Sequence, residues 1–404
     1  MSTDLLYHGF GIHGYEHVET SFDNGEVQLA IRHKRASSRC SSCHCWNVVL
    51  RGEQQRLIRT VPLGRKAVWL LVSIPRVECR RCGVIRQIRL SFAEPRVSYT
   101  RAFERYALDL SQVMTILDVA RHLNVGWDVI KEIQKRNLQR RFKKIKLRDL
   151  QQIAIDEISI GKGHRYVTIV LNLLSGAVVF IGDGKGADAL RPFWTKLKAS
   201  RVQIKAVATD MSPAYIQAVQ ENLPRAVHVF DHFHVIKLFN DKLSAFRRQL
   251  FHEASGPLQK KVLKGTRWLL LKNPENLDEE RNEPERLAAA LQLNQSLATT
   301  YYMKEDLRQI WEQPDKVTAR RVLDDWVRRA ELSGIEMLRK FASTLALGRN
   351  AILAYYDYPI STGPLEGTNN KIRTMQRQAY GFRDYEFFKL KILAIHETKY
   401  ALVG

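Results

Sequence analysis

The sequence predicts a multidomain α+β protein, and three observations lead to this fold class. The first is a β-rich N-terminal stretch that holds all five cysteines, between Cys40 and Cys82. The second is a helical stretch over residues 100–148. The third is an alternation of strand and helix patterns over residues 153–230, followed by a long run of helical periodicity and a short last segment.

Length and charge limit the classes of function. With 404 residues and 45% hydrophobic content, the chain can form two or three domains with cores of their own and is not a disordered polymer. The 64 Lys and Arg against 42 Asp and Glu give a formal net charge of +22, which indicates a polyanionic partner, nucleic acid first and an anionic membrane surface second. No run of about 18 apolar residues and no signal peptide is present, so we expect a cytoplasmic protein with no membrane association.

Residues 1–95 are expected to form a zinc-binding β domain. Strand-like alternation surrounds two C-x-x-C pairs, and a hairpin over residues 56–74 would bring the pairs together. Each pair offers two thiolates on a tight turn, which is the donor set of a structural Zn²⁺ site; unrelated free thiols are the alternative. The predicted ligands are Cys40, Cys43, Cys79 and Cys82. Cys45 and His44 are either spare residues or alternative ligands.

Residues 96–149 read as helices followed by a basic linker. Thr100 and Thr115 are predicted N-caps of two helices, and a third begins at Trp127, after the break at residues 124–126. This layout is typical of a helix-turn-helix with a basic recognition helix, although a plain three-helix bundle has the same periodicity. The cations expected to contact DNA here are Lys131, Lys135, Arg136, Arg140, Arg141, Lys143 and Lys144.

Residues 150–234 predict the first part of an α/β core. Three strands, at residues 153–156, 165–174 and 177–181, are followed by a helix, a strand that ends in Asp210, another helix and a last strand. The order β-β-β-α-β-α-β is that of the ribonuclease H fold. Residues 235–358 have helical periodicity and are too long for a loop, so we expect a helical insertion there. Residues 359–404 would complete the core.

An acid in the core of a sheet is costly unless it is paired or binds metal, so Asp156 and Asp210 raise the question of a third ligand. The candidate is Glu366, on a helix where one face also carries Asn370, Arg373 and Arg377, at steps of four, three and four residues. Three carboxylates can hold two divalent ions, Mg²⁺ or Mn²⁺, at a phosphodiester, and the cations beside them can hold the DNA backbone. For any single acid, a helix cap or a surface position is the alternative.

Two further groups lie near these acids in the sequence. Lys162 and His164 follow the first core strand and either reach the scissile phosphate or solvate a turn. Asp231 and His234 follow the last core strand, with a spacing that suits a metal, although a buried histidine is more often a hydrogen-bonded core residue. In the helical insertion, Trp268 and Trp326 either stack on a DNA base or belong to the core.

Several motifs together resemble bacterial insertion-sequence transposases of the ISL-three group, over essentially the whole chain. They are VECRRC, IDEISIGKGHRY, TDMSPAY, FDHFHVIK, GTRWLLLKNPENL and GPLEGTNNKIRTMQRQAYGFRDYEFFKLKIL. The resemblance implies a DDE transposase in which Asp156, Asp210 and Glu366 form the metal-binding triad. It also places Asp231 and His234 near the active site. It further implies that the zinc and helix-turn-helix segments bind terminal inverted repeats, before strand cleavage and strand transfer.

Two other functions fit part of the same pattern. One is a transposase-derived DNA-binding regulator with an idle catalytic domain, and the other is a nuclease on the ribonuclease H fold that performs no strand transfer. Because two element ends must be joined to one target, a transposase is expected to act as at least a homodimer on double-stranded DNA. The presence of all three candidate acids favours the transposase over the regulator.

Overall fold

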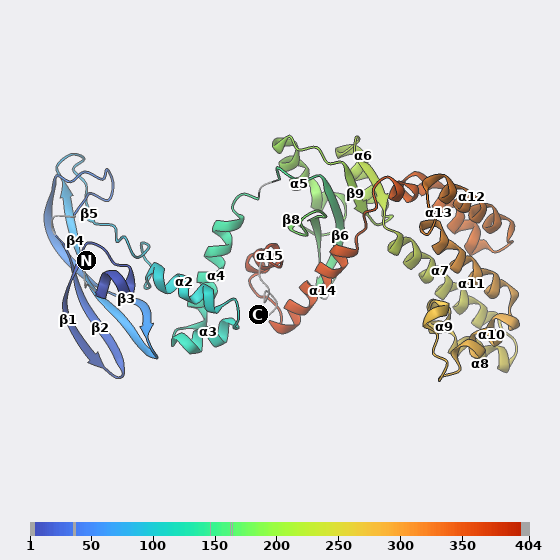
Figure 1. The fold of residues 1–404 in the computed structure, drawn as a ribbon, viewed down its shortest axis with the longest axis horizontal. Coiled ribbons are helices and arrows are strands. Elements are labelled where there is room, and N and C mark those ends of the chain that lie inside the picture. The colour runs from blue at the N-terminus through green and yellow to red at the C-terminus, as the bar shows by residue number, and fades with distance from the viewer. Residues whose placement is uncertain (1–4, 35–37, 146, 162, 164, 397–404) are drawn as a thin grey trace. The chain divides into compact units, whose positions relative to one another are not determined.

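The computed structural model describes residues 5–34, 38–145, 147–161, 163 and 165–396. Two compact units make up the chain: residues 1–143 with 375–404, and residues 144–374. The helices and strands of both units are labelled in Figure 1. Within the described residues, no helix is both long enough and apolar enough to cross a bilayer.

A five-stranded sheet forms the start of the first unit, after the short helix α1 (Leu5–Phe10). Its order is β1-β2-β4-β3, and β5 pairs with the end of β4. Asn24 and Gly25 both have positive φ, which gives the β1–β2 hairpin the tight turn that matches strand twist. The long β3–β4 hairpin is the one that the alternation predicts. The strands are β1 (Tyr15–Asp23), β2 (Glu26–His33), β3 (Val48–Leu63), β4 (Lys66–Cys79) and β5 (Ile85–Gln87).

Three helices follow the sheet: α2 (Arg101–Leu110), α3 (Ile116–Leu123) and α4 (Trp127–Phe142). Both predicted N-caps are present, because the hydroxyl of Thr100 accepts the Phe103 N–H and that of Thr115 accepts the Asp118 N–H. Asn124 ends α3 in the left-handed conformation, with a φ of 50°. The apolar faces of the three helices share one buried core.

A buried arginine joins the sheet to these helices. The guanidinium of Arg59, on β3, donates from Nη2 to the carbonyl of Leu123 at the end of α3, over 2.9 Å. The backbone of Arg59 also donates to Ser98 and accepts from Thr100, each at 2.8 Å. Since only 4% of Arg59 is exposed, these bonds form inside the unit rather than at its surface. The zinc-binding sheet and the three helices are therefore held as one body.

The second sheet has the order β10-β9-β6-β7-β8. Strands β6–β7 and β7–β8 pair antiparallel, and β6–β9 and β9–β10 pair parallel. Helices α5 (Ala187–Ser200) and α6 (Pro213–Asn222) pack their apolar residues against one face. This order and these crossovers confirm the predicted ribonuclease H-like fold. The strands are β6 (Gln152–Gly161), β7 (Arg165–Asn172), β8 (Val178–Asp183), β9 (Ala206–Thr209) and β10 (Val227–Phe230).

The predicted helical insertion separates β10 from α14 (Gly363–Gln378). Trp326 is fully buried and its indole donates to the Met303 carbonyl at 2.8 Å, so it is a core residue. Trp268 is 66% exposed and lies under the guanidinium of Arg267. The long helices of the insertion are α7 (His232–Glu253), α8 (Pro257–Gly265), α9 (Arg267–Leu271), α10 (Glu283–Leu293), α11 (Gln295–Arg308), α12 (Lys316–Leu332) and α13 (Glu336–Leu353).

The last described helix, α15 (Tyr385–Leu393), belongs to the first unit. Its Phe387 and Leu390 form a buried cluster with Leu138 of α4. The last residues of the chain that the structure describes thus pack on the third helix of the three-helix group. The domain boundaries expected from the sequence remain predictions.

Two helical glycines give a matched test of packing. A Cβ at Gly348 of α13 would lie 2.8 Å from the Phe230 ring, whereas a Cβ at Gly367 of α14 meets no atom within 4 Å. We expect Gly348→Ala to destabilise the second unit by about 1–3 kcal/mol through overpacking. Gly367→Ala should instead stabilise it by about 0.4–1 kcal/mol, because alanine has fewer unfolded conformations. Calorimetry of the two variants measures both values, and equal stability would contradict the packing at Phe230.

Candidate active site and metal centres

Asp156 and Asp210 lie side by side at the ends of two parallel strands. Strand β6 pairs with β9 in a register that ends at Ala154 and Ala208, and both aspartates follow two residues later. Since side chains alternate along a strand, residues at the same level of neighbouring parallel strands point to the same face. That face is opposite to the one covered by α5 and α6, because Ile153 and Ile155 belong to the latter core.

The third strand of this edge brings another acid to the same level. Strand β10 pairs with β9 up to Phe230 and Thr209, and the ladder continues because the Asp231 N–H donates to the Thr209 carbonyl at 3.1 Å. Asp231 therefore follows Asp156 and Asp210 in register across three adjacent strands. Its exposed fraction is only 1%.

Burial dominates the electrostatics of Asp156. It raises the pKa of this carboxyl to about 6, and the negative charge of Asp210 adds to the effect. The Glu157 N–H and the charge of His234 act in the opposite direction. Asp156 Oδ1 accepts the Glu157 N–H at 2.8 Å, and Oδ2 accepts the amide of Asn369 from α14 at 3.0 Å. A bound cation would stabilise the ionised form of this half-buried carboxyl.

Asp231 and His234 form a hydrogen-bonded pair beside it. Asp231 Oδ2 lies 2.8 Å from His234 Nδ1 and accepts the hydroxyl of Thr362 at 2.7 Å. Burial alone would raise the pKa of Asp231, but the hydrogen bonds from His234 and Thr362 hold it below its usual value. Burial would likewise lower the pKa of His234, but Asp231 and the nearby Asp156 raise it. The hydrogen bond between them therefore favours an ionised Asp231 and raises the pKa of His234.

Glu366 is exposed, in the first turn of α14, and its N–H donates to the Thr362 carbonyl at 2.9 Å. It follows Thr362 by four residues and precedes Asn369 by three, so it neighbours both along the helix surface. These two residues touch Asp231 and Asp156. Helix α14 therefore brings Glu366 to the edge of the acidic group, although the glutamate forms no hydrogen bond with either aspartate in the described part of the chain.

The three predicted carboxylates are not gathered as tightly as the cysteines. Among the described residues, one group of three or more possible ligand atoms lies within 4.8 Å of one another, and it is the cysteine group. Oxygen donors are nevertheless available, because Oδ1 of Asp231 and Oδ1 of Asn369 are buried with no hydrogen-bond partner in the described part of the chain. Carboxylate and amide oxygens suit a hard divalent cation.

The cations predicted around this site have different positions. Asn370, Arg373 and Arg377 are exposed on α14, and Arg373 donates to the Asn370 side chain at 3.3 Å. Lys162 and His164 lie outside the described residues. The sequence did not predict the hydrogen bonds of Thr362 and Asn369, although Asn369 shares α14 with Glu366 and Thr362 directly precedes this helix.

The four predicted zinc ligands meet in one cluster. Their Sγ atoms lie within 4.8 Å of one another, with Cys40 and Cys82 at 3.7 Å and Cys43 and Cys79 at 3.4 Å. Both C-x-x-C pairs form tight turns, since the His44 N–H donates to the Cys40 carbonyl and the Gly83 N–H to that of Cys79. Two thiolate pairs on such turns are the donor set of a tetrahedral structural zinc.

The backbone favours the thiolate form at one of the four cysteines, Cys79. The N–H groups of Cys82 and Arg81 lower the pKa of Cys79 to about 6, whereas the pKa of Cys43 is raised by its contact with Cys79. Cys45 is outside the cluster, and its Sγ accepts the Asn47 N–H instead. Neither His44 nor Cys45 belongs to the cluster, and the assignment of the four cysteines as the zinc ligands remains a prediction.

Several predicted DNA-binding cations of α4 contact acids within the unit. Lys131 and Lys135 both pair with Asp384, the N-cap of α15, at 3.0 Å, and Lys135 also pairs with Glu386 at 2.9 Å. Sequence spacing gave no signal for these pairs, because about 250 residues separate the partners.

Of the other cations predicted to bind DNA in this segment, some contact groups within the unit and some are exposed. Arg140 pairs with Glu104, and Arg136 donates to the hydroxyl of Tyr99 at 3.0 Å. The remaining three, Arg141, Lys143 and Lys144, are exposed. A phosphate that bound Lys131, Lys135 or Arg140 would therefore compete with an internal acid.

Known protein families match three parts of the chain: the cysteine-containing segment, the three-helix segment and the segment that holds the second sheet. Family models match residues 36–82 to the zinc-finger of the transposases IS204/IS1001/IS1096/IS1165, residues 88–136 to the helix-turn-helix domain of transposase family ISL3, and residues 153–392 to the ISL3 transposase domain. These parts define the class of the protein, a transposase with a zinc finger, a DNA-binding helix-turn-helix and a DDE domain. The chain belongs to the ISL3 family of transposases.

Individual relatives agree with this. The transposase for insertion sequence element IS1001 from Bordetella parapertussis is 33% identical over 96% of both chains. The transposase for IS1557 from Mycobacterium tuberculosis is 29% identical over 86% of this chain and 83% of its own. A solved structure, the Drosophila P element transposase strand transfer complex, aligns at 10% identity and a TM-score of 0.40 over 76% of this chain and 94% of that chain, a likeness too low to support a conclusion.

The zinc content of serine variants distinguishes a predicted ligand, Cys79, from a cysteine outside the cluster, Cys45. We expect Cys79→Ser to lose the bound Zn²⁺ and to lower the melting temperature of the N-terminal unit, because one of four ligands is removed. Cys45→Ser should keep one Zn²⁺ per chain. Atomic emission on the two purified variants gives the result, and zinc loss in Cys45→Ser would contradict the assignment of the four ligands.

The pKa of Asp156 predicts a pH-dependent stability. The folded-state value is raised from 3.8 to about 6, so the ionised carboxyl destabilises the fold above pH 6 by about 3 kcal/mol, and the cost disappears below pH 3.8. In the absence of divalent metal, Asp156→Asn should therefore be more stable than wild type at pH 8 and equal to it near pH 4. Calorimetry at both pH values measures the difference. Equal stability at pH 8 would show that Asp156 is not a destabilised anion.

Proposed function

We propose that this transposase binds the terminal inverted repeats of its insertion sequence, cuts a DNA strand at the element end and joins the freed 3′ end to target DNA. Asp156, Asp210 and Glu366 would hold two divalent ions, Mg²⁺ or Mn²⁺. The observation that carries the proposal is the register that sets Asp156 beside Asp210, with α14 hydrogen-bonded to that edge through Asn369. An idle regulator has no need of an acid buried at such a cost.

The residues of this edge have separate parts in the proposal. When bound, divalent ions supply the activation of a water or 3′ hydroxyl and stabilise the leaving oxygen. Asn369 orients Asp156, and Thr362 and His234 orient Asp231, which adds a fixed negative charge next to the ligands. Asp231 and His234 are therefore positioning residues.

Binding of DNA is assigned to several groups of cations. The exposed Asn370, Arg373 and Arg377 of α14 would hold the DNA backbone near the cut, and Lys162 and His164 are proposed to contact the scissile phosphate. The repeat would be read by α4 and the basic residues that follow it, Lys131, Lys135, Arg136, Arg140, Arg141, Lys143 and Lys144. Since two element ends meet one target, we propose at least a homodimer on double-stranded DNA.

The test is a gel assay with Mn²⁺ and a labelled duplex that ends in the flanking repeat. Asp210→Asn and Glu366→Gln should each lower nicking about 100-fold or more, because a metal ligand supplies several kcal/mol of transition-state stabilisation. Glu157→Gln is the matched control. Its side chain lies on the opposite face of β6, where Glu157 accepts the Tyr215 hydroxyl at 3.3 Å, so nicking should persist.

The products distinguish the rival functions. A transposase gives nicked and joined products, a nuclease gives nicks alone, and a regulator shifts the repeat without metal-dependent cleavage. If Glu366→Gln nicks DNA at the wild-type rate, Glu366 is not a metal ligand. If Asp210→Asn does so, the assignment of Asp156 and Asp210 as a pair of ligands is wrong.

A further inference from the structure

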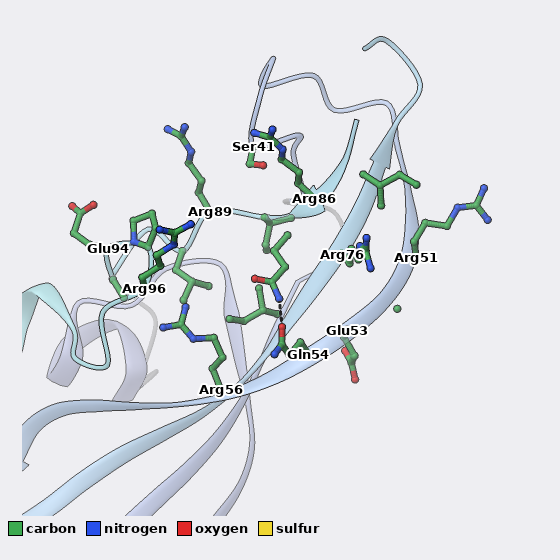
Figure 2. A pocket seen from close by; sticks show the side chains of 18 of the residues that line it. Ser41, Arg51, Glu53, Gln54, Arg56, Arg76, Arg86, Arg89, Glu94 and Arg96 are labelled. Atoms are coloured by element: carbon green, nitrogen blue, oxygen red, sulfur yellow. Dashed lines mark hydrogen bonds between the residues drawn. The ribbon is translucent and has the colours of Figure 1, made fainter. Parts of the chain in front are cut away.

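An arginine-lined groove lies in the first unit, along the zinc-binding sheet, and it reaches the three helices at Arg101, the first residue of α2. It has a volume of about 1240 Å³ and is bordered by β3, β4, β5 and the segment that leads to α2. Seven arginines and two glutamates line it. Figure 2 shows these side chains on the strands and the loop that surround the open space. No part of the proposed function uses this groove.

Some of the arginines are neutralised within the unit. Arg51 pairs with Glu78 and Arg101 with Glu94, each at 2.7 Å. Arg56 donates to a backbone carbonyl at 2.9 Å. These contacts occupy three of the seven guanidinium groups and one of the two lining glutamates, so they leave a strong positive excess in the groove.

The other four arginines, Arg76, Arg86, Arg89 and Arg96, are exposed. None of them has an ion-pair partner in the part of the chain that the structure describes. Arg96 also has a φ of 62°, in the left-handed region that residues other than glycine seldom adopt. Four unpaired guanidinium groups around one open groove repel one another, and a polyanion would remove that repulsion.

The lining indicates which polyanion fits. Planar guanidinium groups bind phosphate through two parallel hydrogen bonds. Proteins that hold single strands also offer aromatic rings on which bases stack, and the described lining contains no Phe, Tyr, Trp or His. The chemistry therefore favours the outer backbone of a duplex over an unpaired strand.

The position of the groove points to the same ligand. Its border includes Arg101, the first residue of α2, and the buried contacts of Arg59 fix the sheet to the end of α3. The groove and the helix-turn-helix domain are therefore parts of one body, and a duplex bound by both would meet two surfaces that are fixed relative to each other.

We propose that this groove binds the phosphate backbone of duplex DNA, next to the segment that the helix-turn-helix domain reads, through Arg76, Arg86, Arg89 and Arg96. The inference rests on the proposed binding of duplex DNA and adds a contact that is independent of base sequence. It lengthens the bound site without adding to its specificity.

The experiment measures how binding by the full chain depends on salt. Fluorescence anisotropy is recorded between 50 and 200 mM salt with a terminal-repeat duplex and a scrambled duplex of equal length. Each lost phosphate contact lowers the slope of log K against log salt by about 0.9. Arg86→Ala with Arg89→Ala should therefore lower the slope by about 1.8, equally on both duplexes.

Two matched variants separate charge from structure. Arg86→Lys with Arg89→Lys keeps both charges and should keep the wild-type slope. Arg225→Ala with Arg320→Ala removes two exposed charges outside the groove and should leave the slope unchanged. Zinc content of each variant confirms that the N-terminal unit is intact.

Two outcomes would overturn the inference: an unchanged slope in the alanine variant, or a loss confined to a single-stranded DNA or RNA of the same length. Failure of the proposed function has a different signature. If wild type does not prefer the terminal repeat over the scrambled duplex, repeat recognition is wrong, while the difference in slope still reports on the groove.

Discussion

Three acidic side chains lie close together at one end of the second sheet, and the repulsion between their negative charges is the constraint on which the rest of this unit depends. Asp156, Asp210 and Asp231 are brought to one level by the pairing of β6, β9 and β10, where Asp231 is fully buried and Asp156 is half-buried. In that surrounding each charge needs a donor or a cation. Each of Asp231 and Asp156 accepts two hydrogen bonds, Asp231 from His234 and Thr362 and Asp156 from the Glu157 N–H and Asn369. The hydrogen bonds of Asp231 hold its pKa low, whereas burial still raises the pKa of Asp156, so the fold stabilises the charge of Asp231 better than that of Asp156.

The same contacts explain how a long insertion can leave the order of the core intact. Helix α7 begins directly after Asp231, and the chain returns to the core at Thr362, 131 residues later. The hydroxyl of Thr362 donates to the carboxylate of Asp231, so the two ends of the insertion are joined at the acidic edge itself. The packing of Gly348 against Phe230 adds an apolar contact one residue before Asp231. Helix α14, which carries Glu366, is therefore positioned by the insertion as well as by the sheet.

Much of this architecture could be predicted from local patterns. The caps at Thr100 and Thr115, the strand order and the two C-x-x-C turns depend on neighbouring residues or on a fixed spacing, and the structure confirms them. The contacts of Arg59 and Asp384 could not be predicted, because each depends on partners that only the tertiary fold brings close. The assignment of Asp156, Asp210 and Glu366 as one metal site remains a prediction, since it came from a family resemblance and a helix pattern.

The pairing of acids and bases also changes how the net charge of +22 should be understood. Lys131 and Lys135 were expected to contact DNA, yet Asp384 lies between them and is held there as the N-cap of α15. A phosphate that displaced Asp384 would leave this acid beside the bound DNA without a counter-charge, which lowers the gain from each lysine. Arg76, Arg86, Arg89 and Arg96 of the groove would carry no such penalty, because none of them has an ion-pair partner among the described residues. Attraction to the DNA backbone that does not depend on sequence should therefore come more from the zinc-binding part of the chain than from α4. Helix α4 would then contribute mainly through its shape and through base contacts of its exposed first turn.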